Sequence, residues 1–504
     1  MIAAVTKIAT PHVDWFAMSP ALALLAVTGI GLLSAVLVPA HLRKAVSATA
    51  AFGGFVGAFV AAALLYAKSA DGALLISGSM SRDRWGALAA IILAGAGALT
   101  VLVSYGEKAK EHVSEYYALI AAAGAGMIFL AQATSLMTIF LALEWFSISL
   151  YVLCAIDIDR ESRLEAGMKY LITGSFGSAF LLFGSALVYG STGTLRLDLI
   201  GKAVADRGLT DDPLLITGLA MALVGLAFKA SLAPFHQWTP DVYQGSPTAI
   251  AGFMGAATKA VAFVLTVRVL TTAFAGEARI WTVALAVFAC ASLVIGNLAA
   301  LVQKDVKRIL AYSSISHAGF MLMAVAANSP LGARAVLYYL IPYAAMSIGA
   351  FAVVSARERE LGRDVTVDDL AGYGWERPVL GVAMWLFMLG FAGFPLTGGF
   401  VGKFYAFSAA YEHGWIWLVI VGAVATAVSL YYYLGIVRQL FLRQPAGAAG
   451  ASVAGRPVVA GGSPPRDLLL QVAVLASVAV TVGSFFGVQP LIDLAKHAAG
   501  SLPF

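Results

Sequence analysis

Two lysines stand close to prolines in stretches of sequence that are otherwise almost entirely apolar. Lys229 lies five residues before Pro234 in GLAFKASLAPFH, and Lys403 lies eight residues after Pro395 in GFPLTGGFVGKF. A charged side chain at the centre of a bilayer costs roughly 2.5–3.5 kcal/mol. A proline leaves a backbone carbonyl that hydrocarbon cannot satisfy. Both features in each half of one chain are typical of ion carriers with broken helices.

Two further ionisable residues lie near the middle of long apolar runs. Glu144 is central in LMTIFLALEWFSISLYVLC, and Lys259 is central in IAGFMGAATKAVAFVLTVRVL. Burial disfavours the charged forms of lysine and glutamate, whereas an opposite charge nearby favours them. A lysine that alternates between paired and unpaired surroundings can therefore gain and lose a proton near neutral pH, which arginine cannot do. The four residues indicate a proton relay at membrane depth.

Several ionisable residues in the apolar runs also have a purely structural interpretation. Lys229 could extend toward the loop at His236 by snorkelling, and Glu144 could be a structural carboxylate bonded within the bundle. Arg268 stands close to the end of an apolar run, so we expect it to snorkel. His317, in LAYSSISHAGFML, fits a hydrogen-bonded packing role as well as a place on the proton path.

Composition places the chain among polytopic membrane proteins. Of its 504 residues, 60% are hydrophobic and 12% are charged, about half the charged fraction of a soluble protein, which is about 25%. The net charge of +5 does not indicate nucleic-acid binding, because the basic residues are scattered through loops. The N-terminus lacks the features of a cleaved signal peptide, so the first apolar run is predicted to be a retained helix.

Several kinds of cofactor chemistry find no support in the sequence. The two cysteines, Cys154 and Cys290, lie in separate apolar runs, and two thiols cannot hold an iron–sulfur cluster. No two of the seven histidines share a helical face, and no phosphate-binding loop of the G-x-x-x-x-G-K-[ST] type occurs. We expect neither a cofactor nor a metal in this chain, so ion movement must be driven by a gradient or by partner subunits.

The apolar runs predict an all-α fold with about fourteen membrane-spanning helices, at ~20 residues each. Helices 7 and 12 should be broken, at Pro234 and at Pro395. The Gly/Ala/Pro-rich segment 444–465 is predicted to be a flexible loop before a C-terminal helix in 467–504. The approximate spans are 18–39, 45–67, 86–105, 114–132, 135–156, 168–190, 214–234, 247–275, 280–302, 308–327, 331–356, 379–411, 414–442 and 467–492.

The distribution of Lys and Arg among the loops predicts the orientation. Odd-numbered loops carry more of them than the termini and even-numbered loops do. By the positive-inside rule, the odd-numbered loops should face the cytoplasm, and both termini should face the periplasm.

Three stretches carry a resemblance to a known family. They are AGMKYLITGSFGSAFLLFGSALVYGSTGTL (166–195), GLAFKASLAPFHQWTPDVYQGSPTAIAGFMGAATKA (225–260) and GNLAALVQKDVKRILAYSSISHAGFMLM (296–323). With these, the chain resembles subunit N of the proton-pumping NADH:quinone oxidoreductase, respiratory complex I, an antiporter-like membrane subunit. The resemblance covers the region from about Glu144 to Arg438 and is loose before 110 and after 440.

The resemblance implies an architecture and a set of roles. Three N-terminal helices (1–110) should precede two inverted five-helix repeats, 114–275 and 280–442, each with one broken helix. Glu144 would pair with Lys229 at an uptake half-channel. Protons would then cross laterally through Lys259 and leave through Lys403. His317 and Lys169 would be secondary members of the same polar axis.

The resemblance also implies partners and a location. The chain would be a subunit of a quinone-reducing translocase in the bacterial inner membrane, beside the antiporter-like subunits M and L and the small subunits K and J. FMN, iron–sulfur clusters and quinone would reside in partner subunits, because the chain itself carries no redox centre. A membrane subunit of a multisubunit Na⁺/H⁺ antiporter is the alternative, and a purely structural arm subunit is a third interpretation.

Overall fold

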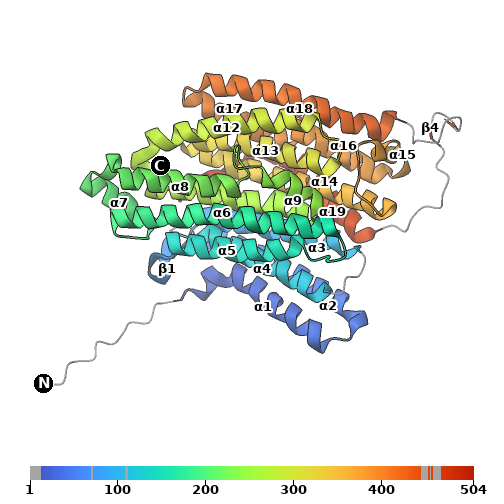
Figure 1. Cartoon of the computed structure of the whole chain (residues 1–504), viewed down its shortest axis with the longest axis horizontal. Helices are drawn as coiled ribbons and strands as arrows, with labels where there is room; N and C mark the ends of the chain where they lie inside the picture. The colour runs from blue at the N-terminus through green and yellow to red at the C-terminus, as the bar shows by residue number, and fades with distance from the viewer. Residues whose placement is uncertain (1–12, 70–71, 108–111, 444–451, 454–455, 458–466) are drawn as a thin grey trace.

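The computed structural model of the chain describes residues 13–69, 72–107, 112–443, 452–453, 456–457 and 467–504. Most of them form helices that run side by side along the long axis of the molecule, as Figure 1 shows. The helices are α1 (Trp15–Leu37), α2 (Ala40–Lys68), α3 (Arg84–Tyr105), α4 (Val113–Gln132), α5 (Leu136–Cys154), α6 (Glu161–Thr192), α7 (Leu197–Arg207), α8 (Pro213–Lys229), α9 (Trp238–Gly245), α10 (Thr248–Phe253), α11 (Lys259–Ala273), α12 (Ala278–Leu301), α13 (Val306–Ala326), α14 (Pro330–Leu361), α15 (Tyr373–Glu376), α16 (Pro378–Ala392), α17 (Gly398–Glu412), α18 (Ile416–Leu442), α19 (Leu468–Phe486) and α20 (Val488–Ala499).

Short helical segments and four small strands complete the described elements. The 3₁₀ segments are η1 (Ile76–Gly78), η2 (Leu209–Asp211), η4 (Ala275–Glu277) and η5 (Asp368–Leu370), and η3 (Met254–Thr258) is a π-helical turn. The strands are β1 (Ala73–Leu75), β2 (Met80–Arg82), β3 (Ser452–Val453) and β4 (Arg456–Pro457), paired antiparallel as β1–β2 and β3–β4. The prediction of a flexible loop at 444–465 falls largely outside the described residues.

Twelve helices of the described part are long and apolar enough to cross a membrane. Two shorter apolar helices, α8 and α16, lie where the sequence predicted the first halves of broken spans. The helix through 248–273, α13 and α14 are almost completely buried, whereas α1, α18 and α19 are largely exposed. The central helices therefore form the protein interior, and the outer ones present apolar side chains on the outside of the bundle.

The two helix breaks are confirmed. Helix α8 ends at Lys229 and α9 begins at Trp238, while α16 ends at Ala392 and α17 begins at Gly398. The second break depends on a glycine, because a Cβ at Gly399 would lie 1.9 Å from the carbonyl oxygen of Gly390 in α16. The two halves of this span thus meet backbone to backbone at the break.

The C-terminal region differs from its prediction. The sequence indicated one helix over 467–492, but the chain ends α19 at Phe486 and starts the shorter α20 at Val488. The reason is Pro490, whose ring would clash with the carbonyl of Phe486 and whose nitrogen cannot donate a hydrogen bond, so it fits only the first turn of a new helix. The sequence also missed the amphipathic helix α7 and the β1–β2 hairpin.

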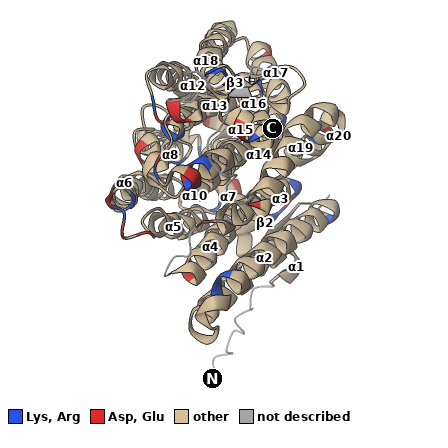
Figure 2. Cartoon of the chain, turned by 90° about the vertical axis from the view of Figure 1, so that its right-hand side faces the viewer, with Lys and Arg blue, Asp and Glu red and all other residues tan. Residues whose placement is uncertain are grey.

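The two ends of the bundle differ in character. The hairpin end holds β1–β2 and α7, on the left of Figure 1. The loop end holds residues 155–160 and 362–372, on the right of the same view. Figure 2 looks at the loop end and shows acidic and basic residues mixed around it. Lys229, Lys259 and Lys403 are nevertheless buried inside the bundle, and each needs a local explanation.

Candidate functional site

Lys229 is the last residue of α8 and is 3% exposed. Its Nζ donates a 2.7 Å hydrogen bond to the hydroxyl of Ser147 on α5, and it lies 4.4 Å from the ring centroid of Phe146. The C-terminal end of a helix carries partial negative charge, which favours a cation there. The side chain stays inside the bundle, so snorkelling toward His236 is excluded.

Glu144 lies on α5 one turn before Ser147 and is partly exposed. Its carboxylate accepts a hydrogen bond from the hydroxyl of Ser178 on α6. Among the described residues it forms no ion pair with Lys229, so the expected pair is near but not closed. Because residues three apart share a helical face, Ser147 and Glu144 offer Lys229 two alternative partners one turn apart.

Lys259 follows the π-helical turn η3 and is completely buried. Its Nζ donates a 2.7 Å hydrogen bond to the backbone carbonyl of Ser314 on α13. Single π-helical turns inside α-helices occur often at functional sites. No carboxylate lies in ion-pair range of this ammonium in the part of the chain that the structure describes.

His317 lies one turn after Ser314 on the same face of α13. Its two ring nitrogens are hydrogen-bonded to tyrosine hydroxyls, Nδ1 to Tyr339 at 2.8 Å and Nε2 to Tyr433 at 3.1 Å. The hydroxyl of Tyr433 also shares a hydrogen bond with Ser313. This network is compatible with both roles expected for His317. It fixes the ring, as a packing role requires, and it offers exchangeable protons, as a place on the proton path requires.

Lys403 lies on α17 and is 4% exposed. Its Nζ donates a 3.1 Å hydrogen bond to the carbonyl of Ala392, the last residue of α16, and lies 4.5 Å from the ring centroid of Phe320. The lysine thus satisfies a carbonyl that the helix break has freed. Phe320 is one turn beyond His317 on α13, so one stripe of α13 runs from the Lys259 contact to Lys403.

Several buried tyrosines lie close to these lysines: Tyr151, Tyr170, Tyr243 and Tyr343. The hydroxyl of Tyr151 interacts with Ser147, and the hydroxyls of Tyr243 and Tyr343 interact with Ser314. Lys229 lies 5.5 Å from the ring centroid of Tyr170. The ring of Tyr343 lies 5.2 Å from that of His317. Ser147 and Ser314 are also the hydrogen-bond partners of Lys229 and Lys259, so these hydroxyls are suited to connect the lysines.

Lys169 does not belong to this row. Its side chain is 44% exposed and forms ion pairs with Glu165 at 2.7 Å and Asp241 at 2.9 Å. Asp241 also pairs with Arg308 at 2.7 Å. Lys169 therefore joins a partly solvated charge network at the start of α6, apart from the buried lysines, and its secondary role on the polar axis stays a prediction.

Arg268 is also placed differently from its prediction. It is buried, with nitrogens bonded to both oxygens of Asp83 at 2.6 and 3.0 Å and to the hydroxyl of Ser81 at 2.7 Å. Asp83 is in turn the N-cap of α3 and accepts from the backbone of Gly86. The arginine does not snorkel because a buried carboxylate from a distant helix start satisfies it, which no local pattern in the sequence reveals.

Sequence reasoning also missed Lys307. The expected span began at 308, which left this lysine in a loop, but α13 begins at Val306 and Lys307 is 3% exposed. Its Nζ lies 3.0 Å from a carboxylate oxygen of Glu358 and 3.6 Å from one of Asp364. The motif KDVKR contains the signal, since Asp305 caps α13 and fixes the helix start.

The fold and the site define a polytopic membrane protein whose interior carries buried lysines beside two broken helices. A family model described as NADH:quinone oxidoreductase/Mrp antiporter, TM matches residues 133–429. That range contains Glu144, Lys229, Lys259 and Lys403.

Relatives narrow this class. The chain is 41% identical to "NADH-quinone oxidoreductase subunit N 2" of Roseiflexus castenholzii, over 88% of this chain and 90% of the relative. It is 36% identical to NADH-quinone oxidoreductase subunit N of Mycobacterium tuberculosis, over 97% and 98%. The chain belongs to the NADH-quinone oxidoreductase subunit N family.

Solved structures agree with this assignment. A chain of respiratory complex I from Thermus thermophilus matches with a TM-score of 0.77 and 33% identity, over 95% of this chain and 99% of that one. A chain of the Mrp complex from Dietzia sp. matches with a TM-score of 0.83 and 23% identity, over 97% of both chains. At that identity the second likeness shows the fold alone.

Proposed function

We propose that this chain is the proton-translocating membrane-arm subunit N of an NADH:quinone oxidoreductase, respiratory complex I. One observation carries the proposal. Lys229, Lys259 and Lys403 are buried, and each donates to a neutral oxygen rather than to a carboxylate. A buried ammonium with only a neutral partner is poorly stabilised, so it can release its proton when the surroundings change.

The relay would run along the row that these residues form. Quinone reduction in partner subunits would change the electrostatics at one end of the subunit. Lys229 would then move between Ser147 and Glu144, its two partners one turn apart, and so alternate between retaining and releasing a proton. The released proton would pass to Lys259, along the His317 stripe of α13, and out beside Lys403.

The setting of the subunit is part of the same proposal. FMN, iron–sulfur clusters and quinone would be bound by partner subunits, and the neighbours would include the antiporter-like subunits M and L and the small subunits K and J. The complex would lie in a bacterial inner membrane with both termini of this chain in the periplasm. The two antiporter-like halves, 114–275 and 280–442, would be inverted repeats of each other.

The test is proton pumping by the whole complex reconstituted into liposomes. Lys229→Ala should abolish the contribution of this subunit, and Lys229→Arg should impair it as well, because a guanidinium retains its proton. Lys202→Ala is the matched control, since Lys202 is an exposed lysine of α7. Near-normal pumping by both Lys229 variants would refute the relay.

A cation/proton antiporter without a redox partner is the second candidate. Its support is the likeness in fold to the Mrp complex chain. The subunit N relatives, more similar in sequence, favour the redox complex. Co-purification in mild detergent separates the two, since only the redox complex brings flavin and iron–sulfur subunits with this chain.

A further inference from the structure

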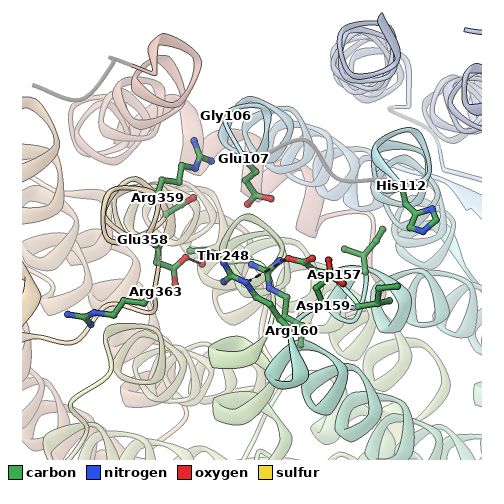
Figure 3. A pocket seen from close by; sticks show the side chains of 15 residues that line it. Gly106, Glu107, His112, Asp157, Asp159, Arg160, Thr248, Glu358, Arg359 and Arg363 are labelled. Carbon is green, nitrogen blue, oxygen red and sulfur yellow. Dashed lines mark hydrogen bonds and ion pairs between the residues drawn. The ribbon is translucent and has the colours of Figure 1, made fainter. Parts of the chain in front are cut away.

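A cavity of about 600 Å³ opens at the loop end of the bundle. It lies where α5 ends, α6 begins and α14 ends, and its charged lining includes Asp157, Asp159, Arg160, Glu358, Arg359 and Arg363. Figure 3 shows that these side chains come from separate elements, with Thr248 and Glu358 close together and Arg363 pointing away from the others. Charges of both signs line the cavity, which suits water and protons better than an ion of either sign.

One wall of the cavity touches a buried charge pair. The hydroxyl of Thr248 donates to a carboxylate oxygen of Glu358, and both residues line the cavity. Behind them, Lys307 lies 3.0 Å from Glu358 and 3.4 Å from both the Thr248 hydroxyl and the Ser246 carbonyl. Lys307 is buried but does not line the cavity, so Glu358 and Thr248 stand between it and the opening.

A loop holds this charge pair in place. Val306 and Lys304 exchange backbone hydrogen bonds with Val365 and Val367, at 3.0 and 2.8 Å. That pairing brings Asp364 to within 3.6 Å of Lys307. The loop that follows α14 therefore positions the start of α13 against the end of α14.

The same face of α13 leads from this pair into the lysine row. Ser314, the partner of Lys259, lies seven residues after Lys307, two helical turns or about 10.5 Å along the axis. Tyr243 of α9 reaches the Ser314 level, because its buried hydroxyl interacts with Ser314 and with Thr258, the residue before Lys259. Its ring is near Gly255, where an added Cβ would be 3.6 Å from it, and Gly255 is one turn before Lys259.

The pocket beside Lys229 is less accessible to water than the loop-end cavity is. The pocket there is small and is lined by Leu143, Leu181 and Phe228, by glycines of α6 and α8, by Ser178 and by Lys229 itself. No other ionisable side chain lines it. The expected uptake route beside Glu144 thus has a narrower and less polar opening than the cavity at the loop end.

We propose that the loop-end cavity is the aqueous mouth of the proton path, and that Glu358 and Lys307 form the gate between this mouth and Lys259. This inference rests on the proposed relay but changes where protons enter it. A proton from cavity water binds the Glu358 carboxylate, which weakens its pair with Lys307. The Lys307 ammonium releases its proton toward Tyr243 and Lys259, and Glu358 then passes its own proton to the Lys307 amine. One proton moves inward, and both gate residues return to their starting charges.

Cysteine labelling of the complete complex tests the mouth. In a background with Cys154→Ala and Cys290→Ala, Thr248→Cys should react with a membrane-impermeant methanethiosulfonate reagent, and the reaction should lower the rate of NADH-driven proton uptake at least about tenfold, the size of one lost hydrogen bond to a charged group. Glu161→Cys is the matched control, because Glu161 is exposed at the same end and does not line the cavity. Ser355→Cys, also on the lining, replaces Thr248→Cys if that variant pumps poorly before labelling.

The gate is tested by Glu358→Gln, with Glu360→Gln as its control. Glu360 lies on the same helix but pairs with Arg357 and Arg377 instead. We expect pumping to fall about tenfold in the first variant and to stay near wild type in the second.

The outcomes separate this inference from the relay itself. Labelling that fails at Thr248→Cys and Ser355→Cys, or that leaves pumping unchanged, overturns the mouth. Normal pumping by Glu358→Gln overturns the gate. If either negative result is found while Lys403→Ala abolishes pumping, the relay is supported but protons must enter it elsewhere. If Lys403→Ala also pumps normally, the relay fails as well.

Discussion

Lys259→Met separates a relay role from a structural role. The lysine is completely buried, makes one hydrogen bond, to the Ser314 carbonyl, and has no carboxylate in ion-pair range among the described residues. Methionine fills a similar volume without a charge, and it adapts well to irregular interiors. The Ser314 carbonyl keeps its helical hydrogen bond within α13, so the substitution leaves no orphaned group behind.

The expected change in stability follows from these contacts. Removing a hydrogen bond to a charged group costs about 1.5–3 kcal/mol. Removing an uncompensated buried charge returns a desolvation penalty of several kcal/mol. These two free-energy changes have opposite signs, and the second is at least as large as the first. The complex that contains Lys259→Met should therefore unfold at the wild-type temperature or above it.

The expected change in function is much larger. A positioned group that gives and takes a proton contributes about 10²–10⁴-fold to a proton-transfer step. Proton flow through this subunit should therefore fall at least ~100-fold in Lys259→Met. Acidification of proteoliposomes driven by NADH measures this flow, and thermal unfolding of the same preparation measures stability.

A structural lysine would give the opposite pattern. It would leave pumping intact in every variant that assembles, and its loss would lower the unfolding temperature. Normal acidification by a stable Lys259→Met complex would therefore refute the relay through this residue. Lys259→Arg is the companion variant, which keeps the positive charge but should still pump poorly.

Three further predictions concern the frame around the relay. Arg268→Met should destabilise the protein by about 3–5 kcal/mol, because it leaves the Asp83 carboxylate buried without an ion-pair partner. The double variant Arg268→Met/Asp83→Leu should recover part of this stability. Thermal unfolding measures both changes. Gly399→Ala should lower stability by about 1–3 kcal/mol through overpacking at the helix break. Gly435→Ala in α18, with open space around it, should leave stability unchanged or slightly higher in the same assay. Hydrogen bonds from Arg363 hold the pKa of Asp369 below its usual value, so their stabilisation of the 362–369 loop is complete above about pH 4, declines below it, and is lost as the pH falls through the lowered pKa. Limited proteolysis should show that loop opening at low pH, and Asp369→Asn should be open at neutral pH as well.

The sequence predicted the elements that depend on local rules. Apolar runs gave the helix ranges to within a few residues at most positions, and the prolines gave the breaks after Lys229 and before Gly398. The three central lysines were found because a charge in a long apolar run is conspicuous whatever its partner. Their burial is what the structure adds.

The sequence failed where partners come from distant parts of the chain. Arg268 was expected to snorkel because Asp83, 185 residues away, cannot be recognised as its partner from local patterns. The burial of Lys307 was missed because the predicted span began one residue too late to include it and because its partner Glu358 lies at the far end of α14. Lys169 received its secondary role through a resemblance, and its ion pairs with Glu165 and Asp241 are visible only in the structure.

The number of protons moved per NADH oxidised tests the central claim most directly. The measurement uses the reconstituted complex with Lys403→Ala in this chain, compared with wild type under the same proton gradient. The relay predicts a lower ratio, or arrested oxidation that an uncoupler cannot restore. An unchanged ratio at a normal rate of oxidation would contradict it.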